Sequence, residues 1–366
     1  MAPAPRFLTS LVYDGLAGWL GRHAGAGPVA VIGNAGRELD DGDAITAMAV
    51  QAVADAGRTA RIVDVRRHRP SELDQAAAVI LTGGDPFRLL ADLRDSGADR
   101  WLRAAHDRGV PIAGQSAGAI VQGPDLAPIR ITSPFDPPDA RNLTGLGLTT
   151  RLVLPHHGRP QRSALHRRAA GDCAAPGTLF PLWDDEVLVE TGADDWHVRR
   201  DRWTTRPARP EDAAGVARVF HEAALQAWSA FLEPARLAAA PLDLDAWTAR
   251  IRSAGTAFLV TEGDRGIAAF ARILPEQAEL DLLYTDPRTA GQGLGRRLLE
   301  RATWMLLCAG HGEAVLWTEA RNARARAVYA ANGWVRDGVV DQRDYLGTPI
   351  RNERFRLDLR RFAGGA

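Results

Sequence analysis

Short β-rich runs alternate with helical patterns through the first half of the chain, and this alternation restricts the possible folds more than any other feature. The runs cover residues 28–34, 60–65, 78–82 and 109–113. After the first run, apolar residues recur with a helical period from Ala44 to Ala56, and Gly57 then supplies a typical helix end. Alternation of strand and helix predicts an α/β fold with a parallel sheet covered by helices. Such sheets bind their ligands at the carboxyl ends of the strands.

A second α/β unit follows a stretch without apolar periodicity. Residues 198–212 are rich in Arg, Asp, Thr and Pro. Beyond them, helical patterns cover 211–229, 294–308 and 322–331, and β-rich runs cover 256–261, 267–273, 278–285 and 314–318. The chain has 366 residues, well above the ~100 to 150 of the commonest domains. We therefore expect two domains, 1–204 and 205–366.

The charge balance favours small-molecule partners. The 45 Lys and Arg residues match the 45 Asp and Glu residues, so no net charge draws the chain to nucleic acid or to a membrane surface. All 45 are Arg, and the lack of lysine excludes a lysine Schiff base, a Ser–Lys dyad and a P-loop lysine. The sequence predicts no particular oligomeric state.

The cysteines and the apolar runs indicate a reduced, cytoplasmic protein. Cys173 and Cys308 are too few for a disulfide framework or a Cys-based zinc site, so we expect free thiols and no metal. The longest uncharged run, 109–124, is shorter than the ~18 residues that a transmembrane helix needs. The first residues have one Arg before Asp14 and no long apolar segment, so we expect no signal peptide.

The segment Gly114-Gln115-Ser116-Ala117-Gly118 has the setting of a nucleophile elbow. It follows a β-rich run and begins a helix of small residues. A sharp strand-to-helix turn there would lift the serine hydroxyl out of the sheet, and glycines on both sides permit the close backbone approach. The helix N-terminus would stabilise negative charge that develops beside the serine.

A serine nucleophile needs a base and a carboxylate that orients the base. His156 and His157 follow the apolar run 152–155, and their spacing does not choose between them. Glu190 ends the run 187–190, while Asp184 and Asp185 lie just before that run. Spacing leaves all three carboxylates as candidates for the third member.

Several motifs in the first 200 residues together resemble the peptidase E family, which includes aspartyl dipeptidases and cyanophycinase-like enzymes. Besides the elbow and Glu190, the matching segments are Leu81-Thr82-Gly83-Gly84, Leu89-Leu90, Ile129-Arg130, Pro155-His156 and Arg159-Pro160-Gln161-Arg162.

The resemblance implies a fold, a reaction and a set of catalytic groups. The fold is that of class I glutamine amidotransferases, but Ser116 stands where those enzymes carry cysteine. The implied triad is Ser116, His156 and Glu190, with an oxyanion hole from the backbone N–H groups of Gly84 and Ala117. The implied reaction is hydrolysis of a small acidic dipeptide or amide.

The resemblance also implies a substrate-binding arginine. Arg159 occupies the place of the family's arginine that binds an aspartyl carboxylate, and the rigid fork of a guanidinium suits that task. Asp85 stands where peptidase E has Asn after the two glycines, and cyanophycinase-like members have Asp there. This departure leaves the substrate open.

A glycine loop joins a strand to a helix in the second unit. Gly291, Gly293 and Gly295 would let consecutive backbone N–H groups converge on an anion, aided by the helix dipole. The spacing G-x-G-x-G does not match a dinucleotide fingerprint, and no Lys-Ser/Thr follows as in a P-loop.

Together with Asn322, Ala325, Tyr329, Gly333 and Trp334, this loop resembles the GNAT acetyltransferases. The resemblance implies acetyl-CoA as co-substrate and Tyr329 as the acid that protonates the departing thiolate. It does not rank the candidate bases. The implied cofactor-binding residues are Gly291, Gln292, Gly293, Leu294, Gly295, Arg296 and Asn322. The candidate bases are Glu279, Asp281 and Glu319. Ala290 stands where the family has Arg or Gln.

Two hypotheses for the whole chain follow. The first is a bifunctional enzyme, a serine peptidase fused to an N-acetyltransferase. The second is an acetyltransferase whose N-terminal domain is a non-catalytic ligand-binding module. The presence of Ser116, His156 and Glu190 together favours the enzyme, because an idle site has no physical need for all three.

Overall fold

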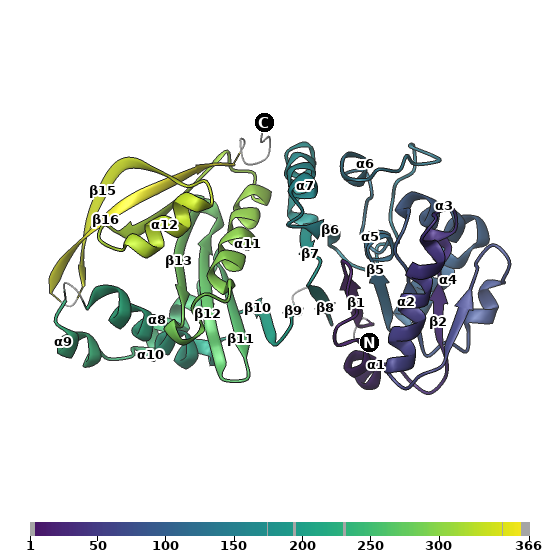
Figure 1. Ribbon diagram of the computed structural model, residues 1–366, viewed down its shortest axis with the longest axis horizontal. Helices are drawn as coiled ribbons and strands as arrows, with labels where there is room; N and C mark the ends of the chain where they lie inside the picture. Colours follow the sequence, from purple (N-terminus) through teal and green to yellow (C-terminus); the bar gives the residue numbers. More distant parts are fainter. Residues whose placement is uncertain (1–3, 174, 193–194, 230–231, 346, 360–366) are drawn as a thin grey trace. The chain divides into compact units, whose positions relative to one another are not determined.

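The computed structural model describes residues 4–173, 175–192, 195–229, 232–345 and 347–359 (Figure 1). The chain forms two compact units, Met1–Asp201 and Arg202–Ala366. The boundary expected after residue 204 falls inside β10 (Trp203–Pro207). This strand pairs antiparallel with β11 (Ala257–Gly263), so it belongs to the second unit.

The first unit contains the expected parallel sheet. Its main sheet has the strand order β9-β8-β1-β5-β4-β2-β3, and β1, β5, β4, β2 and β3 are parallel neighbours. β8 and β9 extend the sheet antiparallel, which the sequence pattern did not predict. The strands of this sheet are β1 (Arg6–Thr9), β2 (Val29–Ile32), β3 (Ala60–Val63), β4 (Ala78–Leu81), β5 (Ile112–Gln115), β8 (Val187–Glu190) and β9 (Trp196–Arg200).

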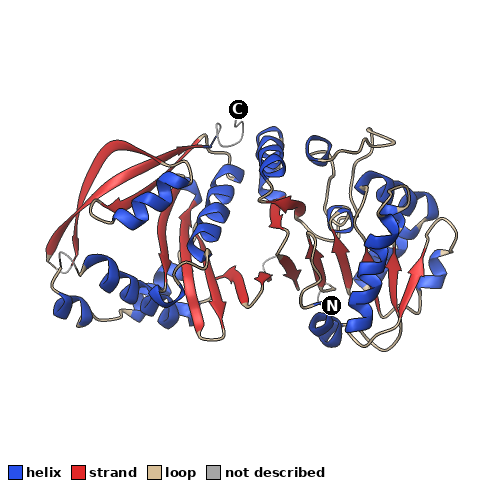
Figure 2. Ribbon diagram, viewed as in Figure 1, coloured by secondary structure: helices blue, strands red, loops and turns tan. Residues whose placement is uncertain are grey.

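A separate parallel pair, β6 (Leu152–His157) and β7 (Leu179–Trp183), lies outside the main sheet. Helices surround the main sheet, as Figure 2 shows. Buried apolar side chains of strands and helices, such as Phe7, Trp19, Val31 and Ile80, form one core cluster. The helices are α1 (Leu16–His23), α2 (Gly42–Asp55), α3 (Pro86–Ser96), α4 (Ala98–Asp107), α5 (Ala117–Ile120), α6 (Ile129–Thr132) and α7 (Pro160–Asp172).

The second unit is built on a mostly antiparallel sheet. Its strand order is β15-β16-β14-β13-β12-β11-β10. The long hairpin of β15 and β16 has no counterpart among the predicted runs. The strands after β11 are β12 (Gly266–Leu274), β13 (Glu279–Thr285), β14 (Glu313–Glu319), β15 (Val335–Tyr345) and β16 (Thr348–Asp358).

The only parallel pair among the described strands of this sheet is short and leaves a gap between β13 and β14. β13 and β14 pair only at Glu279–Val315 and Leu280–Leu316. Beyond these two pairs the strands have no ladder contact in the described residues, and both line a cavity there. The sheet is thus split where a ligand can enter it.

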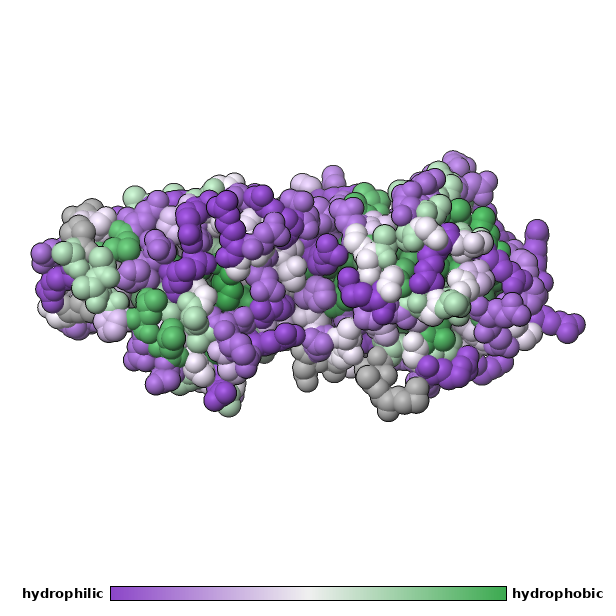
Figure 3. Space-filling model, turned by 90° about the horizontal axis from the view of Figure 1, so that it is seen from below, coloured by the Kyte–Doolittle hydropathy of each residue, from purple (hydrophilic) through white to green (hydrophobic). Residues whose placement is uncertain are grey.

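Helices complete the second unit and supply its core. Val216, Phe258, Val260 and Phe270 belong to a cluster that joins α8 to β11 and β12. On the face seen in Figure 3, polar side chains predominate and apolar ones gather in small patches. The helices are α8 (Ala213–Trp228), α9 (Pro234–Ala238), α10 (Leu244–Arg252), α11 (Leu294–Cys308) and α12 (Ala323–Ala331).

Candidate active sites

The junction of β5 and α5 forms the predicted elbow. Ser116 lies between them with φ 46° and ψ −105°, a strained conformation of the kind that functional sites retain. A Cβ atom on Gly114 would lie 2.3 Å from the Gly118 carbonyl oxygen, and one on Gly118 would lie 2.0 Å from the Leu81 carbonyl oxygen. Both glycines are therefore sterically required for the turn that exposes Ser116.

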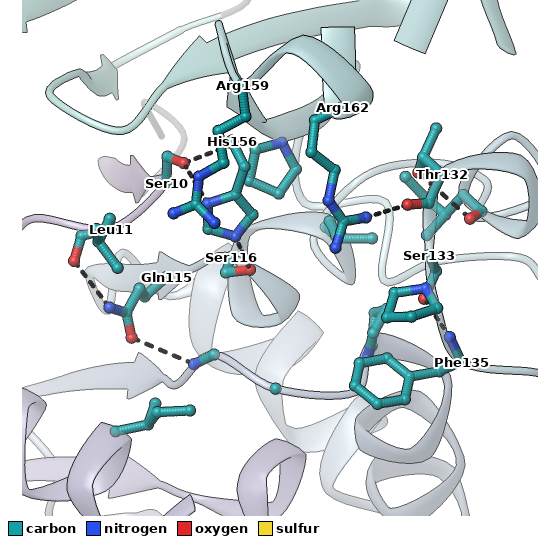
Figure 4. A pocket seen from close by; sticks show the side chains of 18 of the residues that line it. Ser10, Leu11, Gln115, Ser116, Thr132, Ser133, Phe135, His156, Arg159 and Arg162 are labelled. Atoms are coloured by element: carbon teal, nitrogen blue, oxygen red, sulfur yellow. Dashed lines mark hydrogen bonds between the residues drawn. The ribbon is translucent and has the colours of Figure 1, made fainter. Parts of the chain in front are cut away.

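His156 lies beside this serine (Figure 4). It lies in β6 with φ 64°, and its Nε2 lies 3.1 Å from Ser116 Oγ. Its Nδ1 lies 2.7 Å from Asp184 Oδ1, so Nδ1 carries the proton and Nε2 is free to accept one. Burial lowers the pKa of His156, which keeps the imidazole neutral and basic.

The adjacent His157 points elsewhere. Its ring stacks on His166 with 5.3 Å between centroids and meets the edge of Trp183 at 4.6 Å. Successive residues of a strand project to opposite sides, so only one of the two histidines can face Ser116.

Asp184, not Glu190, orients His156, which corrects the assignment from the family resemblance. Glu190 is fully buried, and its carboxylate lies 3.0 Å from Arg6 Nε and 2.5 Å from Arg151 Nη1. Two guanidinium groups hold it in the core. Asp184 lies instead between β7 and β8, in hydrogen-bond contact with His156.

Ser10 and Arg159 fix the position of Asp184. Ser10 Oγ donates to Asp184 Oδ1 at 2.8 Å and accepts from the His156 backbone N–H at 2.7 Å. Arg159 Nε donates to Asp184 Oδ2 at 2.7 Å. Burial alone would raise the pKa of Asp184, but the hydrogen bonds from His156, Ser10 and Arg159 outweigh it and lower that pKa. The carboxylate stays ionised.

The expected oxyanion hole has unoccupied donors. In the described part of the chain, the backbone N–H groups of Gly84 and Ala117 have no hydrogen-bond acceptor. Gly84 has φ +131°, and a Cβ there would lie 2.2 Å from the Ala35 carbonyl oxygen, so glycine is required. Asp85 accepts from the backbone N–H groups of Phe87 and Arg88 and thus caps α3.

A cavity of about 560 Å³ opens onto Ser116. Two cations line it, Arg159 and Arg162, and Figure 4 shows both near His156. Arg162 donates to the Thr132 carbonyl oxygen. Sequence reasoning gave no role to Ser10 or Arg162. Ser10 follows β1, a strand that was not predicted, whereas Arg162 lay inside a recognised motif.

The second unit has a larger cavity of about 980 Å³ beside the glycine loop. Gly291 and Gly293 have φ +82° and +77°, and a Cβ on either would meet no atom within 4 Å. In the described residues, the backbone N–H groups of Gly293, Leu294, Gly295 and Arg296 have no acceptor. The start of α11 therefore has free donors for the anion that the spacing predicts there.

Two other residues expected at the cofactor have local partners. Asn322 Oδ1 accepts from the Ala325 backbone N–H and caps α12. It also lines the cavity. Gln292 Oε1 accepts from Arg202 Nη2 at 2.8 Å.

Tyr329 faces the same cavity from α12. Burial raises its pKa to about 12, so its phenol keeps the proton that a thiolate would take. Asp281 and Glu319 also line the cavity, but Arg272 pairs with Asp281 at 2.6 Å and Arg321 pairs with Glu319 at 3.0 Å. Glu279 does not line it, and burial raises its pKa.

Among the described residues, no group of three or more His, Cys, Asp or Glu side chains is placed to hold a metal ion. Within the same residues, no helix is both long and apolar enough to cross a membrane.

Comparisons with known proteins agree with both halves of this description. Residues 23–193 match the model of Peptidase family S51, and residues 218–347 match that of an acetyltransferase (GNAT) domain. The chain carries an S51 peptidase domain followed by a GNAT domain. The first unit thus has the peptidase E-like, class I glutamine amidotransferase-like fold that was expected, and the second has the GNAT fold.

Curated relatives match each domain separately. Peptidase E of Streptomyces coelicolor is 34% identical to this chain over 129 residues. The aligned region covers 35% of this chain and 52% of that protein. Over 76 residues, the chain is 38% identical to mycothiol acetyltransferase of Beutenbergia cavernae, covering 20% of this chain and 26% of that protein. The chain spans about half the length of the curated peptidases that it matches.

Among solved structures, the S51 domain is similar to a putative peptidase E protein of Listeria monocytogenes. The TM-score is 0.47 at 20% identity, and the match covers 54% of this chain and 99% of that one.

Proposed function

We propose that the S51 domain is a serine hydrolase whose triad is Ser116, His156 and Asp184. The observation that carries this proposal is the continuous contact from Ser116 Oγ through the His156 ring to Asp184, with distances of 3.1 and 2.7 Å. These are hydrogen-bond distances between a nucleophile, its base and the group that orients the base.

The geometry gives each group a step. His156 Nε2 takes the proton of Ser116 as Oγ attacks the scissile carbonyl, and Asp184 stabilises the resulting imidazolium. The N–H groups of Gly84 and Ala117 stabilise the oxyanion. His156 then donates the proton to the leaving amine. A water molecule activated by the same imidazole hydrolyses the acyl-enzyme and restores the serine.

The proposed substrate is a small acidic dipeptide or amide. Arg159 and Arg162 are the cations of the cavity, and each has guanidinium N–H groups without an acceptor in the described residues. They supply donors for a carboxylate of the substrate. Arg159 therefore combines the expected contact to substrate with a hold on Asp184.

We further propose that the GNAT domain transfers an acetyl group from acetyl-CoA to an amine. The free N–H groups at the start of α11 would hold the pyrophosphate. Tyr329 would protonate the departing thiolate, because its pKa of about 12 leaves the phenol protonated at neutral pH. Hydrolysis of a peptide releases an α-amine, so the two activities can act on one pathway.

Mass spectrometry of the intact protein with a dipeptide library, with and without acetyl-CoA, tests this function. We expect free amino acids from acidic dipeptides, and acetylated products only when acetyl-CoA is present. Ser116→Ala should abolish hydrolysis and keep acetylation, while Tyr329→Phe should do the reverse. Acetylated but uncleaved dipeptides would instead support a non-catalytic binding role for the S51 domain.

A further inference from the structure

Aromatic side chains form one wall of the cavity in the GNAT domain. Phe220 and Trp228 come from α8, Tyr284 from β13 and Tyr345 from the end of β15, and all four line the cavity. The ring centroid of Phe220 lies 5.0 Å from that of Tyr284 and 6.0 Å from that of Trp228. The Trp228 and Tyr345 centroids are 4.7 Å apart. We refer to these four residues as the aromatic wall.

The aromatic wall adjoins the reacting end of the cavity. Burial raises the pKa of Tyr284, and the neighbouring phenols of Tyr329 and Tyr345 add to that shift. Tyr284, the proposed acid Tyr329 and Tyr345 all line this cavity, and both of the other phenols act electrostatically on that of Tyr284. An amine that reacts near Tyr329 can therefore place its substituent against the aromatic wall.

The charges of the cavity favour an anionic group on this acceptor. Among the described residues, three carboxylate side chains line the cavity, Asp281, Glu319 and Asp344, against six arginines. Arg272 and Arg321 neutralise the first two carboxylates. The six arginines are Arg250, Arg272, Arg296, Arg321, Arg324 and Arg343.

Arg250 is the cation best placed to take that anion. Its guanidinium lies over Trp247 at 4.8 Å from the ring centroid. Among the described residues, no carboxylate lies within salt-bridge distance of it. Its charge also acts on Tyr284, one of the residues of the aromatic wall. A free guanidinium therefore lies beside an apolar aromatic surface.

We propose that the acetyl acceptor is an α-amino acid with an aromatic side chain, its ring on the aromatic wall and its carboxylate on Arg250. This inference rests on the proposed acetyltransferase function. Aromatic rings gain from edge-to-face and offset contacts with other rings, and arginine pairs well with carboxylate. A polyamine fits poorly beside the aromatic wall, because the charge of Arg250 would repel its positive charges.

The reaction needs only acetyl-CoA and this amine. The neutral amine nitrogen forms a bond to the acetyl carbonyl carbon, and the carbon–sulfur bond breaks. The CoA thiolate takes the proton of Tyr329, and the proton lost by the amine nitrogen restores the phenol through water. The products are the N-acetyl amino acid and CoA thiol.

Thiol release from acetyl-CoA by the intact protein tests the acceptor class. The acceptors are L-phenylalanine, L-alanine, 2-phenylethylamine, the dipeptide Phe-Ala and spermidine. We expect kcat/KM for phenylalanine to exceed that for alanine by about tenfold or more, because the side chain fills an apolar pocket. It should also exceed that for 2-phenylethylamine, which lacks the carboxylate. We expect a lower kcat/KM for the dipeptide Phe-Ala, whose carboxylate lies farther from the amine. A higher value for the dipeptide would overturn the free amino acid as the acceptor.

Variants separate the two contacts. Trp228→Leu should raise KM for phenylalanine and leave that for alanine unchanged. Arg250→Gln should raise KM for phenylalanine about tenfold or more and leave that for 2-phenylethylamine unchanged, since only phenylalanine loses a charge-assisted hydrogen bond to its carboxylate. Arg252→Gln is the matched control, because this exposed arginine ends the same helix but does not line the cavity.

Calorimetry with CoA distinguishes a failure of the proposed acceptor class from a failure of the proposed acetyltransferase function. Each variant should bind CoA as the unchanged protein does, which shows that the domain is folded. Acetylation of alanine or spermidine as efficiently as phenylalanine would overturn the acceptor class but leave the acetyltransferase standing. If the intact protein bound no CoA, the acetyltransferase proposal would fail, and the acceptor with it.

Discussion

Asp184 precedes β8 and Glu190 ends it, yet the two carboxylates have different partners. Glu190 lies in the core between Arg6 and Arg151, whereas Asp184 reaches His156, Ser10 and Arg159. A carboxylate between two buried cations contributes to stability, since it compensates their charge. The proposed role of Asp184, which contacts the imidazole of His156, is catalytic.

Substitutions of the two carboxylates should therefore have opposite effects. Asp184→Asn should lower kcat for hydrolysis by about 10²–10⁴-fold with little change in the melting temperature, because the imidazole loses its orienting anion. Glu190→Gln should keep kcat and lower the free energy of unfolding by about 3–5 kcal/mol, because two largely buried guanidinium groups lose their counter-charge. Steady-state kinetics and denaturant unfolding measure both. The reverse pattern would restore Glu190 to the triad.

The pH dependence of hydrolysis should report the environment of His156. The base must be neutral, and burial lowers its pKa below 6.5, so kcat/KM should fall only as the pH drops through that lowered value. Arg159 also lowers this pKa through its positive charge. Arg159→Gln should therefore move the acidic limb of the profile to higher pH. The exposed Arg141→Gln is a control that should leave the limb in place. A shift to lower pH in Arg159→Gln would contradict the electrostatic argument.

Both proposed sites lie at a junction where a strand is followed by a helix. In the S51 domain the turn between β5 and α5 exposes the hydroxyl of Ser116. In the GNAT domain the loop after β13 presents backbone N–H groups at the start of α11. Glycines make both junctions possible, but for different reasons: packing contact in the first, positive φ in the second.

Gly118→Ala should damage the elbow. Its Cβ would lie 2.0 Å from the Leu81 carbonyl oxygen, so backbone must move. We expect loss of hydrolysis and a free energy of unfolding lower by about 1–3 kcal/mol, the usual cost of forced overpacking. Gly171→Ala in α7 is the matched control, because a Cβ there meets no atom within 4 Å. It should keep activity and be neutral or stabilising. Full activity in Gly118→Ala would show that the elbow tolerates a shift.

Gly293→Val should abolish measurable CoA binding. The residue has φ +77°, which a β-branched side chain rarely adopts, and the added atoms would stand where the anion approaches. Gly310→Val has comparable backbone strain, with φ +88°, but lies beyond the other end of α11. It should lower stability and retain CoA affinity. Calorimetry compares the two, and unchanged affinity in Gly293→Val would remove the loop from the cofactor site.

Each of the two domains has its own hydrophobic core. The buried clusters around Phe7 and Leu8 belong to the first unit, and those around Val216 and Leu232 belong to the second. Each domain therefore has the means to fold on its own.

Fragments 1–201 and 202–366 should each retain their own reaction. A cut after residue 204 should instead impair the second fragment, because it divides β10 and removes part of the ladder to β11. Circular dichroism and the two activity assays make the comparison. With a dipeptide of an acidic and an aromatic residue, such as Asp-Phe, and acetyl-CoA, the intact chain should form acetylated product faster than an equimolar mixture of 1–201 and 202–366, since tethering raises the local product concentration. Equal initial rates would show no benefit from the fusion.

The sequence by itself determined the features that depend on neighbouring residues. Strand–helix alternation, the elbow around Ser116 and the glycine loop at 291–295 are local patterns, because side-chain periodicity and backbone freedom are set within a few positions. The family motifs then pointed to both folds. The run 187–190 was predicted as well, but its antiparallel pairing, strand β9 and the hairpin of β15 and β16 lay outside these patterns.

Tertiary structure decided everything that depends on distant segments meeting. Spacing alone left His156 and His157 equal, and packing of His157 against Trp183 and His166 separated them. Glu190 pairs with the buried Arg6 and Arg151, because a charge in the core needs a counter-charge beside it. Asp184 is the carboxylate that contacts the imidazole of His156. The aromatic wall likewise joins α8, β13 and β15, whose nearness no local pattern contains.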